Sequence, residues 1–513
     1  MSFPLLIDNS EIALRHRKAV ALIATRVQQF SARQQPFRIY HGSTNSTRPS
    51  KYCIDQMVNT SDLCNILAIH RDTYTALVEP NVPMDKLVEA TLQHRLIPPV
   101  VMEFPGITVG GGFAGTSGES SSFKYGFFEH TVNCIEVVLP NGEIVIASKT
   151  RNSDLFHGAA SSFGTLGVTT LLEIQLIEAK TYVELTYHPV SSIQEAMQKF
   201  QETTNDTTTR IDYLDGILFT RGCGVVCIGK LKDSVESGIA IQRFSRAKDP
   251  WFYLHAKQVL DRRLKDPTTE AVPLVDYLFR YDRGGFWVGS FAFKYFMTPF
   301  NRFTRWVLDK FLHTRVMYHA LHQSGLSKRY IVQDVGVPYP AADEFIRFLE
   351  ENFSYYPLWL CPLHQSPQAQ QYTFSQFAAN GDSLGPEWML NVGIWGIGPN
   401  RMDKFVDVNR QLEHKVQELG GKKWLYAHTY YTEEEFWAIY ERKRYDELRE
   451  KFHATYLPTV YDKVKVDFGV GRNPKGLLAR FRSVFWNIWP LRGLYGLLHA
   501  GFGGDYLLSR KSE

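Results

Sequence analysis

Three short stretches rich in Gly, Ser and Thr are the part of this chain best suited to binding chemistry. They are His41-Gly42-Ser43-Thr44-Asn45-Ser46, residues 110–125, and Phe163-Gly164-Thr165-Leu166-Gly167-Val168. Small residues let a ligand approach main-chain N–H groups, which bind phosphate, and the hydroxyls add donors. One such stretch is equally consistent with a structural turn. Three of them, each after a β-like segment, predict a site for the diphosphate of a dinucleotide.

Residues 110–115, GGGFAG, match the GxGxxG pattern of the Rossmann fold. In that fold a helix begins inside the motif, and an acidic residue follows about twenty positions later at the end of a strand. Here we expect the motif to continue into a loop rich in Ser and Thr. The sequence therefore argues against a Rossmann domain.

Composition excludes several classes of protein. Of the 513 residues, 44% are hydrophobic and 21% are charged, as in a globular protein. The net charge of +4 comes from scattered residues, so we predict no binding of nucleic acid. The six cysteines show no CxxC and no metal-ligand spacing, which indicates reduced thiols in an intracellular protein and no metal site.

The elements that must position the glycine stretches fall into four segments. We expect an amphipathic helix over 1–34, an α+β domain over 35–180, a mixed α/β domain over 181–465, and an extension over 466–513. Since the chain contains no run of about 18–20 apolar residues, it predicts neither a transmembrane span nor a signal peptide.

Periodicity predicts the elements of both domains. In the first, we expect a helix over 84–94 and a hairpin turning at Pro140-Asn141-Gly142. In the second, strands are predicted near 181–188, 211–228, 286–294, 388–395 and 424–430. Helices are predicted near 192–203, 300–325, 341–352, 401–418 and 433–450.

Longer strings resemble one family. HGSTNSTR, TVGG with GTSGESSSFKYG, LPNG, and SDLF with GTLG resemble the FAD-binding domain of the vanillyl-alcohol oxidase type flavoproteins. GESSSFKYGFFEH, YYPLWLCPL, YAHTYYTEEEFW and YDELREKF with LPTVYDKVK are similar to the sterol side-chain (Δ24) reductase branch. The resemblance covers residues 35–465. It implies an α+β fold, with a two-lobed FAD-binding domain of the PCMH type followed by an α/β substrate (cap) domain.

The resemblance also implies the contacts of FAD. Thr116 to Phe128 matches the segment that wraps the diphosphate, and the first loop would lie across from it. The implied FAD-binding residues are His41, Gly42, Ser43, Thr44, Asn45, Ser46, Gly110, Gly111, Thr116, Ser117, Gly118, Glu119, Ser120, Ser121, Lys124, Tyr125, Gly126, Gly164, Thr165, Gly167 and Val168. Many relatives attach the flavin to a histidine in this loop. Asn45 takes that place here, which favours noncovalent FAD, with His41 as the alternative attachment point.

The implied reaction reduces the Δ24 double bond of a sterol with hydride that passes from NADPH through the flavin. An isolated alkene also needs an acid to protonate its second carbon. The predicted catalytic residues are Tyr430, Tyr431 and His428, on a strand that returns toward the flavin. Secondary candidates are Gln333, Asp334, Arg280, Asp282 and Arg283. Tyr430 is equally consistent with a packed aromatic residue whose hydroxyl is hydrogen-bonded.

Two other functions stay open. The same FAD domain hosts many reactions, so the chain is also compatible with a flavin oxidase or dehydrogenase that acts on a small alcohol or secondary metabolite. A non-catalytic sterol-binding or scaffold protein that kept the fold is the third reading. The aromatic content of 14% suits either an apolar tunnel for a rigid lipid or an ordinary core.

The C-terminal extension departs from the family pattern. Animal members begin with an apolar anchoring helix, for which we find no counterpart. Residues 477–499 instead place Trp and Arg beside an apolar face that Pro490 interrupts, as in helices that lie in the bilayer interface. They predict peripheral contact with the endoplasmic reticulum membrane. A helix packed on the protein core is the alternative.

Overall fold

The computed structural model describes residues 10–42, 53–206, 208–262, 266–365, 386–466 and 488–503. The predicted FAD-binding residues Ser43, Thr44, Asn45 and Ser46 lie outside these ranges, as does most of the C-terminal extension. Among the helices that are described, none has the length and apolar character needed to cross a membrane.

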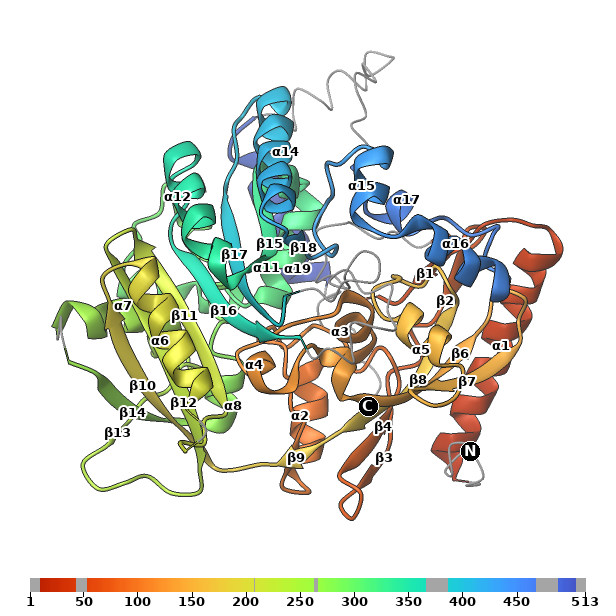
Figure 1. Cartoon of the computed structure of the whole chain (residues 1–513), viewed down its shortest axis with the longest axis horizontal. Helices are drawn as coiled ribbons and strands as arrows, with labels where there is room; N and C mark the ends of the chain where they lie inside the picture. The colour runs from red at the N-terminus through yellow and green to blue at the C-terminus, as the bar shows by residue number, and fades with distance from the viewer. Residues whose placement is uncertain are drawn as a thin grey trace.

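The first unit is built around an antiparallel sheet (Figure 1). In sheet order its strands are β3 (Ile66–His70), β4 (Thr75–Val78), β8 (Val168–Gln175), β6 (Val132–Val138) and β7 (Ile144–Ser148). The turn between β6 and β7 places Gly142 at a φ of +89°, a conformation that glycine adopts without strain. The predicted hairpin at residues 140–142 is therefore confirmed.

Several helices and short strands outside the sheet complete this unit. They are α1 (Glu11–Ala32), β1 (Arg38–Tyr40), β2 (Met57–Asn59), α2 (Met84–Leu92), β5 (Leu96–Ile97), α3 (Val109–Gly115), α4 (Ser122–Tyr125), α5 (Ser153–Ala159) and β9 (Ile177–Glu178). The GGGFAG motif forms helix α3, capped by Thr108, and not the expected loop. The rejection of a Rossmann domain still holds, because the five-stranded sheet pairs antiparallel throughout.

Helix α1 is fixed to the sheet by a buried charge cluster. Its residue His16 contacts Glu79 through Nδ1 at 2.7 Å and Glu136 through Nε2 at 3.1 Å. Burial works to lower the pKa of His16, but the hydrogen bonds to Glu136 and Glu79 outweigh it and raise the pKa to about 9. The imidazolium therefore donates from both nitrogens, so this helix is an integral part of the first unit.

The second unit contains a nine-stranded sheet. In sheet order its strands are β13 (Ala240–Ile241), β14 (Thr268–Pro273), β10 (Tyr182–Val190), β12 (Cys223–Lys232), β11 (Tyr213–Thr220), β16 (Leu358–His364), β17 (Trp388–Ile397), β15 (Tyr330–Pro338) and β18 (Lys422–Lys423). Helices α6 (Ile193–Asn205), α12 (Ala342–Asn352) and α14 (Met402–Glu418) pack on one face around an aliphatic core (Figure 1). The opposite face is aromatic, with Tyr187, Trp359 and Trp395 packed toward Phe252 and Trp287.

Several predicted elements of this unit are wrong or incomplete. The predicted strand near 286–294 is instead a turn at 286–288 followed by helix α9 (Gly289–Tyr295). A short aromatic run does not distinguish a buried helix from a strand. Residues 424–430 form turns, in which Thr429 alone bridges to Lys465. The range 211–228 is a hairpin of two strands. Strands β14, β15 and β16 were not predicted.

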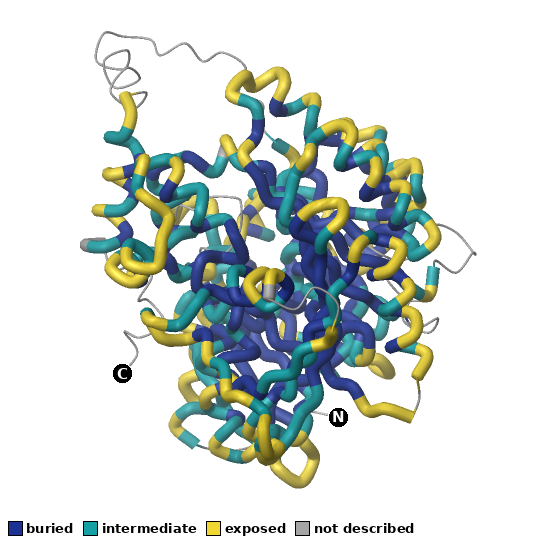
Figure 2. Tube along the Cα trace, turned by 90° about the vertical axis from the view of Figure 1, so that its left-hand side faces the viewer, coloured by how far each residue is buried: buried dark blue, intermediate teal, exposed yellow. Residues whose placement is uncertain are grey.

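The predicted helices over 300–325 and 433–450 are each interrupted. The first divides into α10 (Arg302–Val307) and α11 (Thr314–Ser324), and the second into α15 (Glu433–Ile439) and α16 (Arg442–Lys451). Together with α17 (Val460–Val464), the latter pair returns to the first unit, where the Tyr445 hydroxyl donates to Thr165 at 2.7 Å. Figure 2 shows the buried trace concentrated through the middle of the molecule, with exposed segments around it.

Candidate functional site

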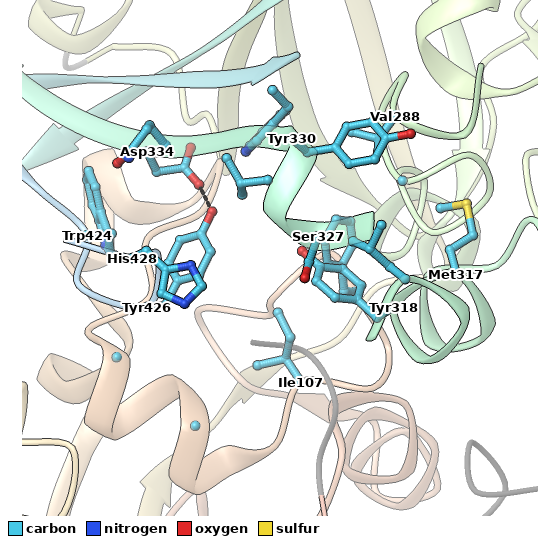
Figure 3. A pocket seen from close by; sticks show the side chains of 18 of the residues that line it. Ile107, Val288, Met317, Tyr318, Ser327, Tyr330, Asp334, Trp424, Tyr426 and His428 are labelled. Carbon is cyan, nitrogen blue, oxygen red and sulfur yellow. Dashed lines mark hydrogen bonds between the residues drawn. The ribbon is translucent and has the colours of Figure 1, made fainter. Parts of the chain in front are cut away.

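A cavity of about 2070 Å³ lies between the two units. Pockets for one drug-sized ligand are about 300–1,000 Å³, so this cavity has room for a dinucleotide and a second molecule. All three predicted stretches contribute to its lining, through His41, through residues between 110 and 119, and through Phe163, Gly164 and Gly167. Side chains from α9, α11, β15 and the turns at 424–430 line it as well (Figure 3).

The structure divides the predicted FAD-binding residues into two groups. Those that line the cavity are His41, Gly110, Gly111, Ser117, Gly118, Glu119, Gly164 and Gly167. Those described but outside the lining are Gly42, Thr116, Ser120, Ser121, Lys124, Tyr125, Gly126, Thr165 and Val168.

The segment 120–126 turns away from the cavity because it joins the two units. Lys124 pairs with Asp212 at 2.9 Å, and the Ser120 carbonyl accepts the N–H of Leu214 at 2.7 Å. Just before this segment, Thr116 adopts a left-handed φ of +49°, and its carbonyl accepts the indole N–H of Trp424 at 2.9 Å. These residues act in the structure as an inter-unit joint.

The residues that line the cavity fit a dinucleotide. A Cβ atom added at Gly115 would meet no atom within 4 Å, so its main chain stands open to a ligand. Gly164 and Gly167 have φ values of +73° and +146°, which favour glycine and keep this turn free of side chains. A diphosphate would find here the small-residue main chain that its binding requires.

Basic side chains gather at the same end. Arg38, His41 and Lys463 line the cavity, and the Lys463 ammonium donates to the Phe163 carbonyl at 2.5 Å beside the glycine turn. Burial, with the charge of Lys463, lowers the pKa of His41. Arg38 and Lys463 therefore provide positive charge where an anionic ligand meets the turn.

The three predicted catalytic residues differ in whether they line the cavity. Tyr430 and His428 line the cavity, whereas Tyr431 does not, and its hydroxyl donates to the Glu413 carbonyl at 3.0 Å. Burial raises the pKa of Tyr431 well above its ordinary value, with the Glu413 carboxylate adding to it. The Tyr430 N–H donates to both Glu413 carboxylate oxygens at 3.0 Å.

Residues 424–430, predicted as a strand, form turns that a buried ion pair holds in place. Lys423 contacts the Glu413 carboxylate at 2.6 Å and donates to the His428 carbonyl at 2.5 Å. Since both side chains are fully buried, removal of either charge would leave the other buried and uncompensated. The hydrogen bonds of the pair to the main chain hold the turns in place. A buried pair of this kind is not visible in the periodicity of the sequence.

A carboxyl–phenol pair is the most distinctive chemistry in the cavity. Asp334 of β15 accepts a short hydrogen bond from the Tyr426 hydroxyl, and both side chains line the cavity (Figure 3). Burial raises the pKa of Asp334 to about 7; the bond from Tyr426 opposes this shift, and nearby Glu103 adds to it. The sequence signal was an acid inside the apolar run IVQDVGVP, which we ranked below the tyrosines.

Two further carboxyl groups line the cavity. Burial raises the pKa of Glu119 well above its ordinary value, and the Glu103 carboxylate and its hydrogen bond add to the shift. Burial beside the Glu103 carboxylate therefore disfavours the charged form of Glu119. Tyr318 faces the Asp334–Tyr426 pair across the cavity (Figure 3).

Comparisons with known proteins agree with this geometry. A family model described as an FAD binding domain matches residues 17–148. The Delta(24)-sterol reductase of Macaca fascicularis is 30% identical over 426 residues, which cover 82% of this chain and 80% of the relative. That of Arabidopsis thaliana is 30% identical over 437 residues, covering 80% and 76%.

A more distant relative matches a shorter part of the chain. Cytokinin dehydrogenase 4 of Oryza sativa subsp. japonica is 29% identical over 140 residues, or 27% of this chain and 26% of the relative. The predicted α+β fold, with an FAD-binding domain and a large mixed sheet, is confirmed. The chain is thus an FAD-dependent oxidoreductase of the vanillyl-alcohol oxidase type and belongs to the family of the Delta(24)-sterol reductases.

Proposed function

We propose that this protein reduces the side-chain (Δ24) double bond of a sterol with hydride from NADPH, carried by noncovalently bound FAD. The observation that carries the proposal is one continuous cavity. It joins the open glycine main chain of the first unit to an apolar, aromatic wall and an Asp334–Tyr426 acid pair in the second. The names of the relatives that match both units support the same substrate.

The residues of the chain have distinct roles in this proposal. Gly115, Gly164 and Gly167 would hold FAD through their main chain, with Arg38 and Lys463 near its phosphates. When bound, FAD supplies the two-electron chemistry of hydride transfer. The aromatic wall, which includes Phe104, Phe286 and Trp395, would exclude water and hold a rigid apolar substrate.

Asp334 is the residue we favour as proton donor. A carboxyl group whose pKa is near 7 carries a proton at neutral pH and can release it, as a general acid must. The carboxylate left after transfer to the alkene carbon would keep the hydrogen bond from Tyr426. Tyr430 and His428, which also line the cavity, remain the predicted alternatives.

Anaerobic turnover tests this proposal. The yellow protein should bleach with NADPH and regain its colour with a side-chain-unsaturated sterol, whose saturated product is identified by mass spectrometry. If no sterol in a panel reoxidises the flavin, and an alcohol is instead oxidised with consumption of oxygen, the enzyme is an oxidase. Protein that folds without flavin would favour the scaffold reading.

Denaturation tests the mode of FAD attachment. Noncovalent FAD should pass through a filter after unfolding, while the chain is retained. Flavin that stays on the chain would indicate a bond to the protein, and mass spectrometry of peptides that contain His41 would then locate it.

A further inference from the structure

Helix α10 (Arg302–Val307) is a short helix that buries none of its residues. Phe303 is 68% exposed and Trp306 is 53% exposed, although both are large apolar side chains. Their rings lie 6.0 Å apart and form one surface feature. Soluble proteins rarely leave such a group uncovered, and larger apolar patches of this kind mark sites of interaction.

Helix α19 (Leu491–Gly503), far away in sequence, extends this surface. It packs closely on α11, where Gly496 faces the Ala320 carbonyl and the Arg492 guanidinium donates to the Gly325 carbonyl at 2.6 Å (Figure 1). The Trp489 indole donates to the Tyr295 carbonyl at 2.7 Å, which brings α19 to the end of α9. The exposed apolar residues of the two segments are Met297, Phe300, Phe303, Trp306, Val307, Ile488, Trp489, Leu494, Tyr495 and Leu498.

Side chains of this surface also line the cavity, which places an opening of the cavity beside α19. Leu498 is 57% exposed and also lines the cavity, and Leu494 does both as well. From the other segment, Leu308, Lys310 and Phe311 line the same space. An apolar ligand could therefore pass from this surface into the cavity along apolar side chains.

The charges within the two segments that form this surface are almost all positive. Residues 284–333 contain seven Lys or Arg and one acidic residue, Asp309, which is buried and paired with Arg283. Residues 488–503 contain no acidic residue. Lys294, Arg302 and Lys310 are exposed beside the apolar side chains. Trp, Phe and Leu together with Lys and Arg are the residues that bind a bilayer interface rich in anionic lipid.

We infer that α10 and α19 together form a docking surface for an anionic lipid bilayer, which holds the opening of the cavity against the membrane. The sequence predicted membrane contact only through residues 477–499, and helix α10 was not expected to take part. This inference does not depend on the substrate being a sterol. It requires only that the exposed side chains enter the interface.

Flotation of the full-length, FAD-loaded protein with vesicles tests the inference. Vesicles of phosphatidylcholine and phosphatidylserine in equal parts should carry the protein, and vesicles of phosphatidylcholine alone should carry much less. The double variant Phe303→Ser/Trp306→Ser should bind about tenfold or more weakly, because two aromatic side chains no longer enter the interface. Arg302→Gln should weaken binding to the anionic vesicles about fivefold.

A matched control uses exposed apolar residues elsewhere. Leu22 of α1 and Ile241 of β13 are 64% and 54% exposed and lie on other parts of the molecule (Figure 1), so Leu22→Ser/Ile241→Ser should bind vesicles as the unchanged protein does. Equal thermal melting and flavin content would show that each variant is folded. Wild-type protein that binds neither vesicle, or a Phe303/Trp306 variant that binds normally, would overturn the inference. So would a dimer in solution that this variant dissociates, since a second copy would then cover the surface.

Discussion

At the residue scale, the proposed acid makes a prediction about pH. Asp334 must be protonated to act, and burial raises its pKa to about 7. The rate of flavin reoxidation by the alkene should therefore be high below pH 7 and fall as the pH rises through it. Asp334→Asn should lower this rate by at least 100-fold, within the range for loss of a general acid of about 10²–10⁴, and abolish the pH dependence. Stopped-flow spectroscopy measures both.

The Tyr426→Phe variant tests whether Asp334 is the proton donor, because it removes the hydrogen bond to the Asp334 carboxylate. The Tyr426 hydrogen bond lowers the pKa of Asp334, so its loss should move the descending limb of the profile to higher pH while activity is partly retained. A profile that keeps its limb near pH 7 in Asp334→Asn would assign the proton to Tyr430 or His428 instead. Reduction by NADPH, which needs no such acid, serves as the internal control in each variant.

Sequence patterns were informative about small residues and much less so about side-chain chemistry. The glycines at 110–118 and 164–167 were recognisable because few other residues allow main chain so close to a ligand. Tyr430 and Tyr431 are adjacent in sequence and differ in environment, since the hydroxyl of Tyr431 is bonded to the Glu413 carbonyl outside the cavity. That difference depends on a buried ion pair between Lys423 and Glu413, which periodicity does not predict.

At the scale of elements, helix α3 makes a prediction about flavin retention. A Cβ at Gly115 would enter open cavity, whereas one at Gly112 would overlap Met102 and Phe128. Gly115→Val should therefore fold normally and lose most of its flavin. Gly112→Val should lose stability by about 1–3 kcal/mol through overpacking. The absorbance ratio of flavin to protein and thermal melting measure the two effects. Equal flavin content in Gly115→Val and wild type would refute the proposed contact between FAD and the main chain of Gly115.

Helix α1 makes a second prediction at this scale, about stability. The His16→Gln variant leaves Glu79 and Glu136 buried without their cation, which should cost about 3–5 kcal/mol. Because the folded pKa of about 9 exceeds the ordinary value of 6.5, the stabilisation is complete below pH 6.5 and is lost as the pH rises through 9. Denaturant unfolding at several pH values should thus show the wild-type advantage shrinking over that interval. The exposed pair of Arg15 and Glu11 offers the control, since Arg15→Gln should change nothing measurable.

The elements also show where periodicity fails. The expected N-terminal helix over 1–34 corresponds to α1 (Glu11–Ala32) in the described residues, and periodicity did not predict the buried ion pairs of its residue His16. In the second unit, the predicted strand near 286–294 is a turn followed by helix α9, and a single helix was predicted where α10 and α11 are separate. Both errors fall where aromatic residues dominate and the helices are short. A helix of fewer than two turns is too short for its periodicity to be distinguished from that of a strand.

At the scale of the whole molecule, we expect the two units to unfold together and FAD to stabilise both. Residues of both line the cavity, and the joint at 116–126 ties them through Lys124 to Asp212 and through Trp424 to the Thr116 carbonyl. FAD at about 100 times its dissociation constant should stabilise the folded chain by about 2.7 kcal/mol. If the units unfold together, the apoprotein should melt in one transition that FAD moves to higher temperature without splitting it. Calorimetry of apoprotein titrated with FAD measures this shift.

FMN, which lacks the adenylate half, should give a smaller shift because it leaves part of the first unit's glycine main chain without a ligand. Two transitions of which FAD moves only one would show that the second unit folds independently, and that the joint does not couple the cofactor to the substrate side of the cavity.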